Sequence, residues 1–212
     1  QTINWLFRYR LETVDQDGLP EDAFASTLLS RLTVLQGITD QLSAGVEFDY
    51  VAQLGDSSFN NSLNGKTQYP LIADPAGSDL NQAYVLYQQP GYQLKVGRQK
   101  LALGNERFVG SVGWRQNEQT FDAIRYQTKL GNHLKLDYSF SNRVNRVFGS
   151  KSTQGDWRSN IHLFDLNYAI TQNQQVSVYA YEMDFTEAPL QSNRTLGMDF
   201  KQQGQLGRYT YL

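Results

Sequence analysis

The chain has 212 residues and a formal net charge of −2, so its overall charge gives no reason to expect a nucleic-acid partner. It contains no cysteine, which excludes disulfides, thiolate catalysis and cysteine-ligated metals. No window approaches the ~18 consecutive apolar residues of a membrane-spanning helix. Aromatic residues are abundant, with 13 Tyr, 11 Phe and 3 Trp, and in so polar a chain they favour β structure.

Apolar and polar residues alternate from the N-terminus onward. Every odd position of residues 3–11 is apolar, and residues 42–50 and 134–140 repeat the alternation. A period of two indicates amphipathic strands. We expect strands at 3–14, 24–38, 42–54, 80–88, 92–102, 120–129, 133–141, 161–170, 175–185 and 194–202, with an eleventh that begins near residue 207.

The connections between these strands alternate strictly between short and long. The short ones fall near 39–41, 89–91, 130–132, 171–174 and 203–206. The long ones fall near 15–23, 55–79, 103–119, 142–160 and 186–193. Tight turns at one end and loops at the other are the plan of an outer-membrane barrel, and strands of ~9–11 residues match a tilted membrane crossing. We expect the loop at 55–79 on the outer surface.

The sequence therefore predicts an all-β protein, an antiparallel up-and-down transmembrane β-barrel, with residues 1–212 as one domain. A soluble β-sandwich or closed barrel would also alternate. Ionised groups on the polar face, however, favour a wet lumen, and repeated aromatics on the apolar face favour lipid contact. We expect lipid contact for Trp5, Phe7, Tyr9, Phe48, Tyr50, Tyr138, Phe140 and Tyr168. The opposite, lumenal face would carry Glu47, Asp49, Lys135 and Asp137.

The predicted strand number is odd, and the last strand is interrupted at residue 212. An open edge in lipid would leave unpaired backbone groups, each at a cost of several kcal/mol. We therefore expect the chain to be the N-terminal part, or half, of a longer barrel.

One segment, residues 97–126, places arginines beside aromatics and glycines where a strand, a long loop and another strand follow one another. Its guanidinium groups stay charged and offer planar forks of donors. Turned inward, they would form a positive constriction that focuses anions. The arginines are Arg98, Arg107, Arg115 and Arg125.

The same segment also allows a structural interpretation. Glu106, Glu118 and Asp122 could pair with the arginines and pin the loop inside the barrel. Both interpretations can hold together, because a folded-in loop narrows a pore. The register of Val96 aims Arg98 outward, whereas a bulge at Gly97 would turn it inward, and the sequence leaves this open.

The stretch VGRQKLALGNERFVGSVGW (96–114), followed by TFDAIR (120–125), resembles the alginate-export family of outer-membrane barrels. The shared pattern is a strand that ends in Gly-Arg-Gln, an Arg-Phe-Val-Gly loop, a Trp, and Phe-Asp at the start of the next strand. The resemblance implies an 18-stranded monomeric barrel in the outer membrane of a Gram-negative cell. It also implies passive passage through an arginine-rich lumen, with alginate the best-known cargo.

Several cations fall on the polar faces of strands or in the segment 97–126. Facing acids would partly neutralise them, so we expect a modest preference for anions. The expected partners are outer-membrane lipid and a small or polyanionic solute, without a cofactor. The candidate solute path comprises Arg8, Arg10, Arg31, Lys95, Arg98, Arg107, Arg115, Asp122 and Arg125.

The sequence gives little support for catalysis or for metal binding. Only two histidines exist, His133 and His162, and no glycine-flanked serine elbow is present, so we expect no enzyme. The DQDG at 15–18 lacks the later Gly and Glu of a calcium loop, because Pro20 and Ser26 occupy those places, so we expect no metal. Two alternatives stay open: an adhesive or structural surface barrel with a plugged lumen, and a soluble secreted glycan-binding β protein.

Overall fold

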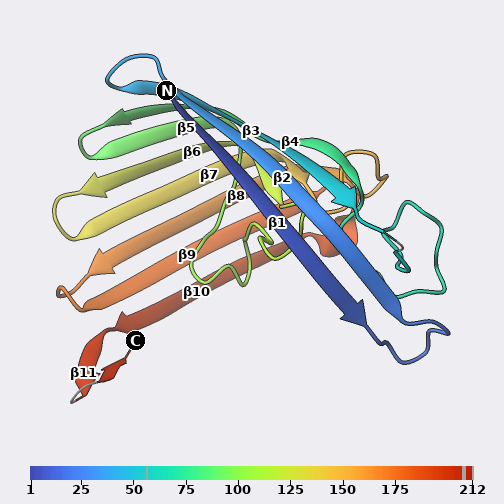
Figure 1. The fold of residues 1–212 in the computed structure, drawn as a ribbon. Helices are drawn as coiled ribbons and strands as arrows, with labels where there is room; N and C mark the ends of the chain where they lie inside the picture. The colour runs from blue at the N-terminus through green and yellow to red at the C-terminus, as the bar shows by residue number, and fades with distance from the viewer. Residues whose placement is uncertain (56, 207–208, 212) are drawn as a thin grey trace.

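The computed structural model describes residues 1–55, 57–206 and 209–211. Ten strands form one antiparallel sheet in which each strand pairs with its neighbours in the chain (Figure 1). They are β1 (Thr2–Val14), β2 (Ala23–Gly37), β3 (Leu42–Gln53), β4 (Gly77–Gln89), β5 (Tyr92–Gln99), β6 (Thr120–Leu130), β7 (Leu134–Asn145), β8 (Asp156–Ala169), β9 (Gln174–Phe185) and β10 (Asn193–Gln202). A short 3-10 helix, η1 (Pro189–Gln191), lies between β9 and β10. Within the described residues, no helix is long and apolar enough to cross a membrane.

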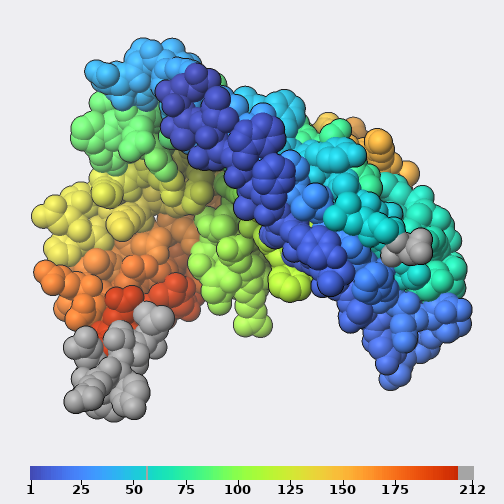
Figure 2. Space-filling view, in the orientation of Figure 1, coloured from blue at the N-terminus to red at the C-terminus, as the bar shows by residue number. Residues whose placement is uncertain are grey.

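The sheet curves into an open arc whose two edges are β1 and β10 (Figures 1 and 2). Its order follows the chain without a crossover, as an up-and-down barrel requires. Short turns join the strands at one end of the arc and longer loops at the other. The predicted all-β antiparallel fold is confirmed, in the form of an arc of barrel wall.

Strand positions agree with the sequence prediction to within a few residues, except at the loop ends of β7 and β8. Both strands are longer than expected, because β7 continues to Asn145 and β8 begins at Asp156. The register shifts between Ser141 and Arg143, so the alternation is interrupted there and the sequence pattern no longer shows a strand. β5 is shorter than expected and ends at Gln99.

The eleventh strand was predicted to begin near residue 207, and residues 207–208 lie outside the described part of the chain. On either side, β11 (Gly204–Leu206) and β12 (Tyr209–Tyr211) pair as a small antiparallel hairpin, separate from the ten-stranded sheet.

The two faces of the arc differ as the alternation predicts. On the convex face Trp5, Phe7 and Phe48 are more than half exposed. On the concave face Glu47 and Asp49 are buried under a loop. An apolar outer face with aromatic side chains suits contact with lipid.

Cysteine labelling provides a test of these faces. In the full-length protein in membranes, Phe48→Cys and Tyr138→Cys should react with a membrane-soluble maleimide and resist a water-soluble one, because lipid covers the convex face. Lys135→Cys, on the opposite face, is the matched control and should react with the water-soluble reagent. Rapid water-soluble labelling at both convex sites would contradict the assignment.

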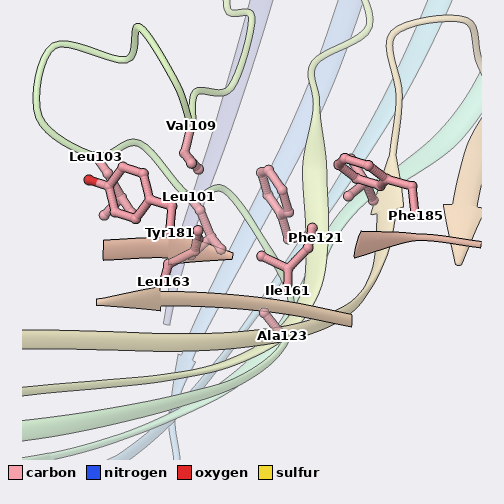
Figure 3. Close-up of a cluster of buried hydrophobic side chains, with 10 residues drawn as sticks. Leu101, Leu103, Val109, Phe121, Ala123, Ile161, Leu163, Tyr181 and Phe185 are labelled. Atoms are coloured by element: carbon pink, nitrogen blue, oxygen red, sulfur yellow. The ribbon is translucent and has the colours of Figure 1, made fainter. Parts of the chain in front are cut away.

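Two apolar clusters lie under long loops rather than in the centre of a globular core. One packs Phe59 and Ile72, from the connection between β3 and β4, against Ala23 and Ala25 of β2. Phe59 and Ile72 are fully buried, so part of this connection folds back against the strands, and its location on the outer surface stays a prediction. The other cluster holds the connection between β5 and β6, residues 100–119, which we call the inner loop (Figure 3).

Candidate pore constriction

The inner loop enters the concave side of the arc rather than extending past the strand ends (Figures 1 and 2). β5 ends early, and Leu101, Leu103 and Val109 follow as buried side chains. They pack against inward side chains of β6–β9 (Figure 3), namely Phe121, Ala123, Val144, Ile161, Leu163, Tyr181 and Phe185. The first half of the loop is therefore held by apolar burial.

The second half of the inner loop is held by polar contacts to β1 and β2. Arg8 donates from Nε to Gln116 Oε1 at 2.9 Å and from Nη1 to the Gly113 carbonyl at 2.9 Å. It also donates to the Arg115 carbonyl. Gln116 is fully buried and donates from Nε2 to Thr27 Oγ1 at 2.9 Å. Arg8 therefore serves as a clamp on the loop backbone.

A buried aspartate extends this attachment. Asp74, at the end of the β3–β4 connection, accepts a hydrogen bond from the Gln116 backbone at 2.7 Å and pairs with Arg10 at 3.2 Å. The Arg10 guanidinium lies 4.4 Å from the centre of the Trp114 ring. Arg115 in turn pairs with Glu12 at 3.0 Å. Two long connections and β1 thus meet on one side of the arc.

Arg31 of β2 is the centre of the densest charge cluster. It binds Asp49 through two hydrogen bonds of 2.7 Å and pairs with Glu118 of the inner loop at 3.0 Å. Glu47 lies 3.6 Å from the Arg31 Nε. The side chain of Arg31 is only 7% exposed, so this cation is almost wholly shielded from solute.

Two further side chains complete the cluster. Lys100 pairs with Glu118 and lies 3.5 Å from Glu47. Asn81 Nδ2 donates to Glu47 at 2.7 Å and to Glu118 at 3.1 Å. Burial raises the pKa of the Glu118 carboxyl, but contacts with Lys100 and Arg31 more than offset it, so the pKa lies below its usual value. Glu118 is therefore ionised at neutral pH and ties the loop to β2.

Three further candidate cations lie on the concave side. Lys95 lies on the concave side, its ammonium 3.5 Å from the centre of the Tyr84 ring. Arg125 pairs with Asp137 on the concave side, with Nε 3.0 Å from Oδ1. Arg107 is exposed on the inner loop.

Arg98 lines a recess together with Asp49 and Glu118, the two acids that pair with Arg31. Arg98 binds Asp122 through hydrogen bonds of 2.7 and 3.1 Å. The register of β6 with β7 shifts between Asp122 and Ala123, so the alternation of faces is interrupted at this position. Gly97 has φ +123°, and the pairing of β5 with β4 continues past it without a register shift.

Several participants carry no signal that sequence reasoning could use. Gln116, Asp74, Lys100 and Asn81 were not among the candidates, because their roles depend on where the inner loop folds. Glu106 was one of three acids that could have pinned the loop to the wall. Instead its carboxylate accepts a hydrogen bond from the Ser111 backbone at 3.1 Å, within the loop itself.

Comparison with known proteins agrees with this architecture. The family model described as "Alginate export" matches residues 2–207. The crystal structure of OccAB4 from Acinetobacter baumannii superposes with a TM-score of 0.64 at 15% sequence identity. The match covers 98% of this chain and 55% of the OccAB4 chain, so this chain spans about half of that length. No curated protein sequence matches the chain. By the extent of the family match, which takes in the whole ten-stranded sheet and the inner loop, the chain belongs to the alginate export family.

Proposed function

We propose that this chain forms part of the wall, and the constriction, of an outer-membrane channel through which small solutes diffuse passively. The observation that carries the proposal is the inner loop, which is fixed inside the arc by apolar contacts on one side and by ion pairs on the other. A loop held in this way narrows a barrel without filling it. The family match favours a channel over an enzyme.

The convex face supports a location in the outer membrane of a Gram-negative cell, with lipid as the partner of the exposed aromatic side chains. We propose a single barrel rather than an assembly, because a closed barrel leaves no strand edge to pair. Passage follows the solute gradient and requires no cofactor.

The charges on the concave face favour weak rather than strong ion selectivity. Around the second half of the inner loop, the cations Arg8, Arg10, Arg31, Lys100 and Arg115 meet an equal number of carboxylates, Glu12, Glu47, Asp49, Asp74 and Glu118. Paired charges of opposite sign largely cancel in the field that a passing ion meets. Among the concave-face cations whose side chains the structure describes, Lys95, Arg107 and Lys135 form no salt bridge, and Arg8 bonds to Gln116 and to backbone carbonyls rather than to a carboxylate.

We therefore infer a modest preference for anions to which Lys95 and Arg107 contribute. This preference is compatible with a polyanion such as alginate as cargo, the substrate class that the family description names. Small anionic solutes meet the same requirement.

Planar-bilayer recording of the full-length protein tests both function and selectivity. The wild type should conduct ions with a reversal potential slightly on the anion side. Lys95→Glu with Arg107→Glu should move it toward cations, and the shift should shrink as salt rises, since the screening length falls from ~10 Å at 0.1 M to ~3 Å at 1 M.

Lys66→Glu is the control, because the Lys66 ammonium is held by the Ser57 carbonyl at 2.8 Å within the β3–β4 connection. It should leave the reversal potential almost unchanged. A correctly inserted protein that does not conduct would favour a plugged adhesive barrel. Cation selectivity before any mutation would make polyanion export untenable.

A further inference from the structure

A recess lies beneath the first half of the inner loop, on the inner face of β8, β9 and β10. It encloses about 370 Å³ and opens toward the concave side. Leu103 and Phe108 of the loop form one wall. Its floor comes from the three strands and consists of Asp165, Asn167, Ser177, Tyr179 and Asp199. Of the two cations that the proposed selectivity uses, Arg107 lines this recess and Lys95 does not.

Cross-strand register explains the arrangement of the floor. Asp165 pairs with Tyr179, and Ser177 pairs with Asp199, so the two carboxylates lie diagonally on either side of β9. The Tyr179 ring lies over Gly197, where a Cβ atom would fall 2.2 Å from the ring. The glycine thus lets the ring lie along the wall between the carboxylates.

Aromatic rings enclose one side of the recess. Tyr179 and Tyr181 stack with ring centres 5.1 Å apart, and Phe108 lies 6.0 Å from Tyr179. Phe108 belongs to the inner loop, so the recess exists only when that loop is folded inward. Faces of aromatic rings attract cations and pack against apolar groups.

Among the residues whose side chains the structure describes, the two floor carboxylates have no cationic partner. Asp165 is 8% exposed and accepts hydrogen bonds from the Tyr181 hydroxyl at 2.9 and 3.0 Å. The Asp199 Oδ2 atom is buried and has no hydrogen-bond partner among the residues whose side chains are described. Within that same set, neither carboxylate has a Lys, Arg or His nitrogen within 4.0 Å. Buried carboxylates without a cation are unfavourable and attract one.

Three cations also line the recess, and their positions decide where its unpaired charge lies. They are Arg107, Arg125 and Lys201. Arg125 is already neutralised by Asp137, which also accepts a hydrogen bond from Gln127 at 2.6 Å. Arg107 and Lys201 are exposed, so solvent screens them. The unpaired negative charge is therefore in the floor, and the free positive charge is at the mouth.

We propose that this recess binds the ammonium group of a small organic amine. The ammonium would lie between Asp165 and Asp199 against the Tyr179 ring, and an apolar or aromatic stem would pack under Phe108. The site would bind cations locally on a solute path that otherwise slightly favours anions. This proposal rests on the proposed function, because only a conducting lumen brings solutes to the recess.

The probe is 2-phenylethylamine, with 2-phenylethanol as the neutral molecule of similar shape. Calorimetry on the full-length protein in detergent should detect binding of the amine and at least tenfold weaker binding of the alcohol. In bilayers, the amine should produce interruptions of the single-channel current that the alcohol does not.

Two variants locate the site. Asp199→Asn removes a carboxylate oxygen that has no described partner, so it should spare the fold and weaken amine binding about tenfold, as should Asp165→Asn. Asp40→Asn, in the exposed turn between β2 and β3, is the control and should bind like the wild type. Equal binding of amine and alcohol, or unchanged binding in both variants, would overturn the proposal.

The two readouts separate this proposal from the channel function. A protein that conducts but shows no heat of amine binding would overturn the ammonium site alone. A protein that binds the amine in detergent but does not conduct would support the site and overturn the channel.

Discussion

Replacing Arg31 by methionine should destabilise the full-length protein by about 3–5 kcal/mol, because it leaves buried carboxylates without their cation. Asp49 and Glu118 contact the guanidinium at 2.7 and 3.0 Å, and both are more than nine-tenths buried. Methionine restores the apolar stem of arginine but not its donors. Urea-induced unfolding in detergent, followed by tryptophan fluorescence, measures the loss.

The matched control is Arg194→Met. Arg194 also forms a cross-strand ion pair, with Glu182 at 2.6 Å, but its side chain is 81% exposed. Exposed ion pairs typically contribute about 0–1 kcal/mol, so this variant should unfold almost like the wild type. Similar effects of the two substitutions would show that the Arg31 cluster is more hydrated than its geometry indicates.

The same substitution should also change conduction. Without Arg31, Glu118 loses a contact that ties the inner loop to β2, although Lys100 still reaches it. The excess negative charge on the concave face should shift the reversal potential toward cations, and a looser loop should raise the conductance. An unchanged reversal potential would mean that the cluster lies off the solute path.

The strands and their faces were predictable from the sequence because both depend on a local period of two. Residues 42–50 show apolar side chains at every even position, and β3 exposes those side chains on the convex face. The prediction was wrong where the register shifts beside Ser141, since a bulge interrupts the alternation and hides the end of β7.

The roles of the arginines could not be predicted in the same way. Arg8 clamps Gln116, which is 108 residues away in the chain, and this contact exists only because the inner loop folds inward. The sequence placed Arg8 near the lumen and Gln116 in a long loop, but it did not predict that the two residues pair. The possibility of an ion-pair network that pins the loop followed from the closeness of acids to the arginines in the sequence. Which acids take part, Glu118 rather than Glu106, depended on the path of the loop.

Apolar burial holds the other half of the constriction, and Leu101→Ala should loosen it without changing any charge. Leu101 is fully buried against the inward side chains of β6–β9. Truncation of a buried leucine typically costs about 2–5 kcal/mol, part of it from the cavity that remains. Leu190→Ala is the control, because Leu190 is 97% exposed in η1 and contributes almost no burial.

In bilayers, Leu101→Ala should increase the conductance and its fluctuations, since only Leu103, Val109 and Phe108 would still hold the first half of the loop to the wall. The reversal potential should stay that of the wild type, in contrast to Arg31→Met, because every charge on the concave face remains in place. A change in selectivity equal to that of Arg31→Met would mean that the two halves of the loop move as one unit. A current like that of Leu190→Ala would show that the ionic half alone fixes the constriction.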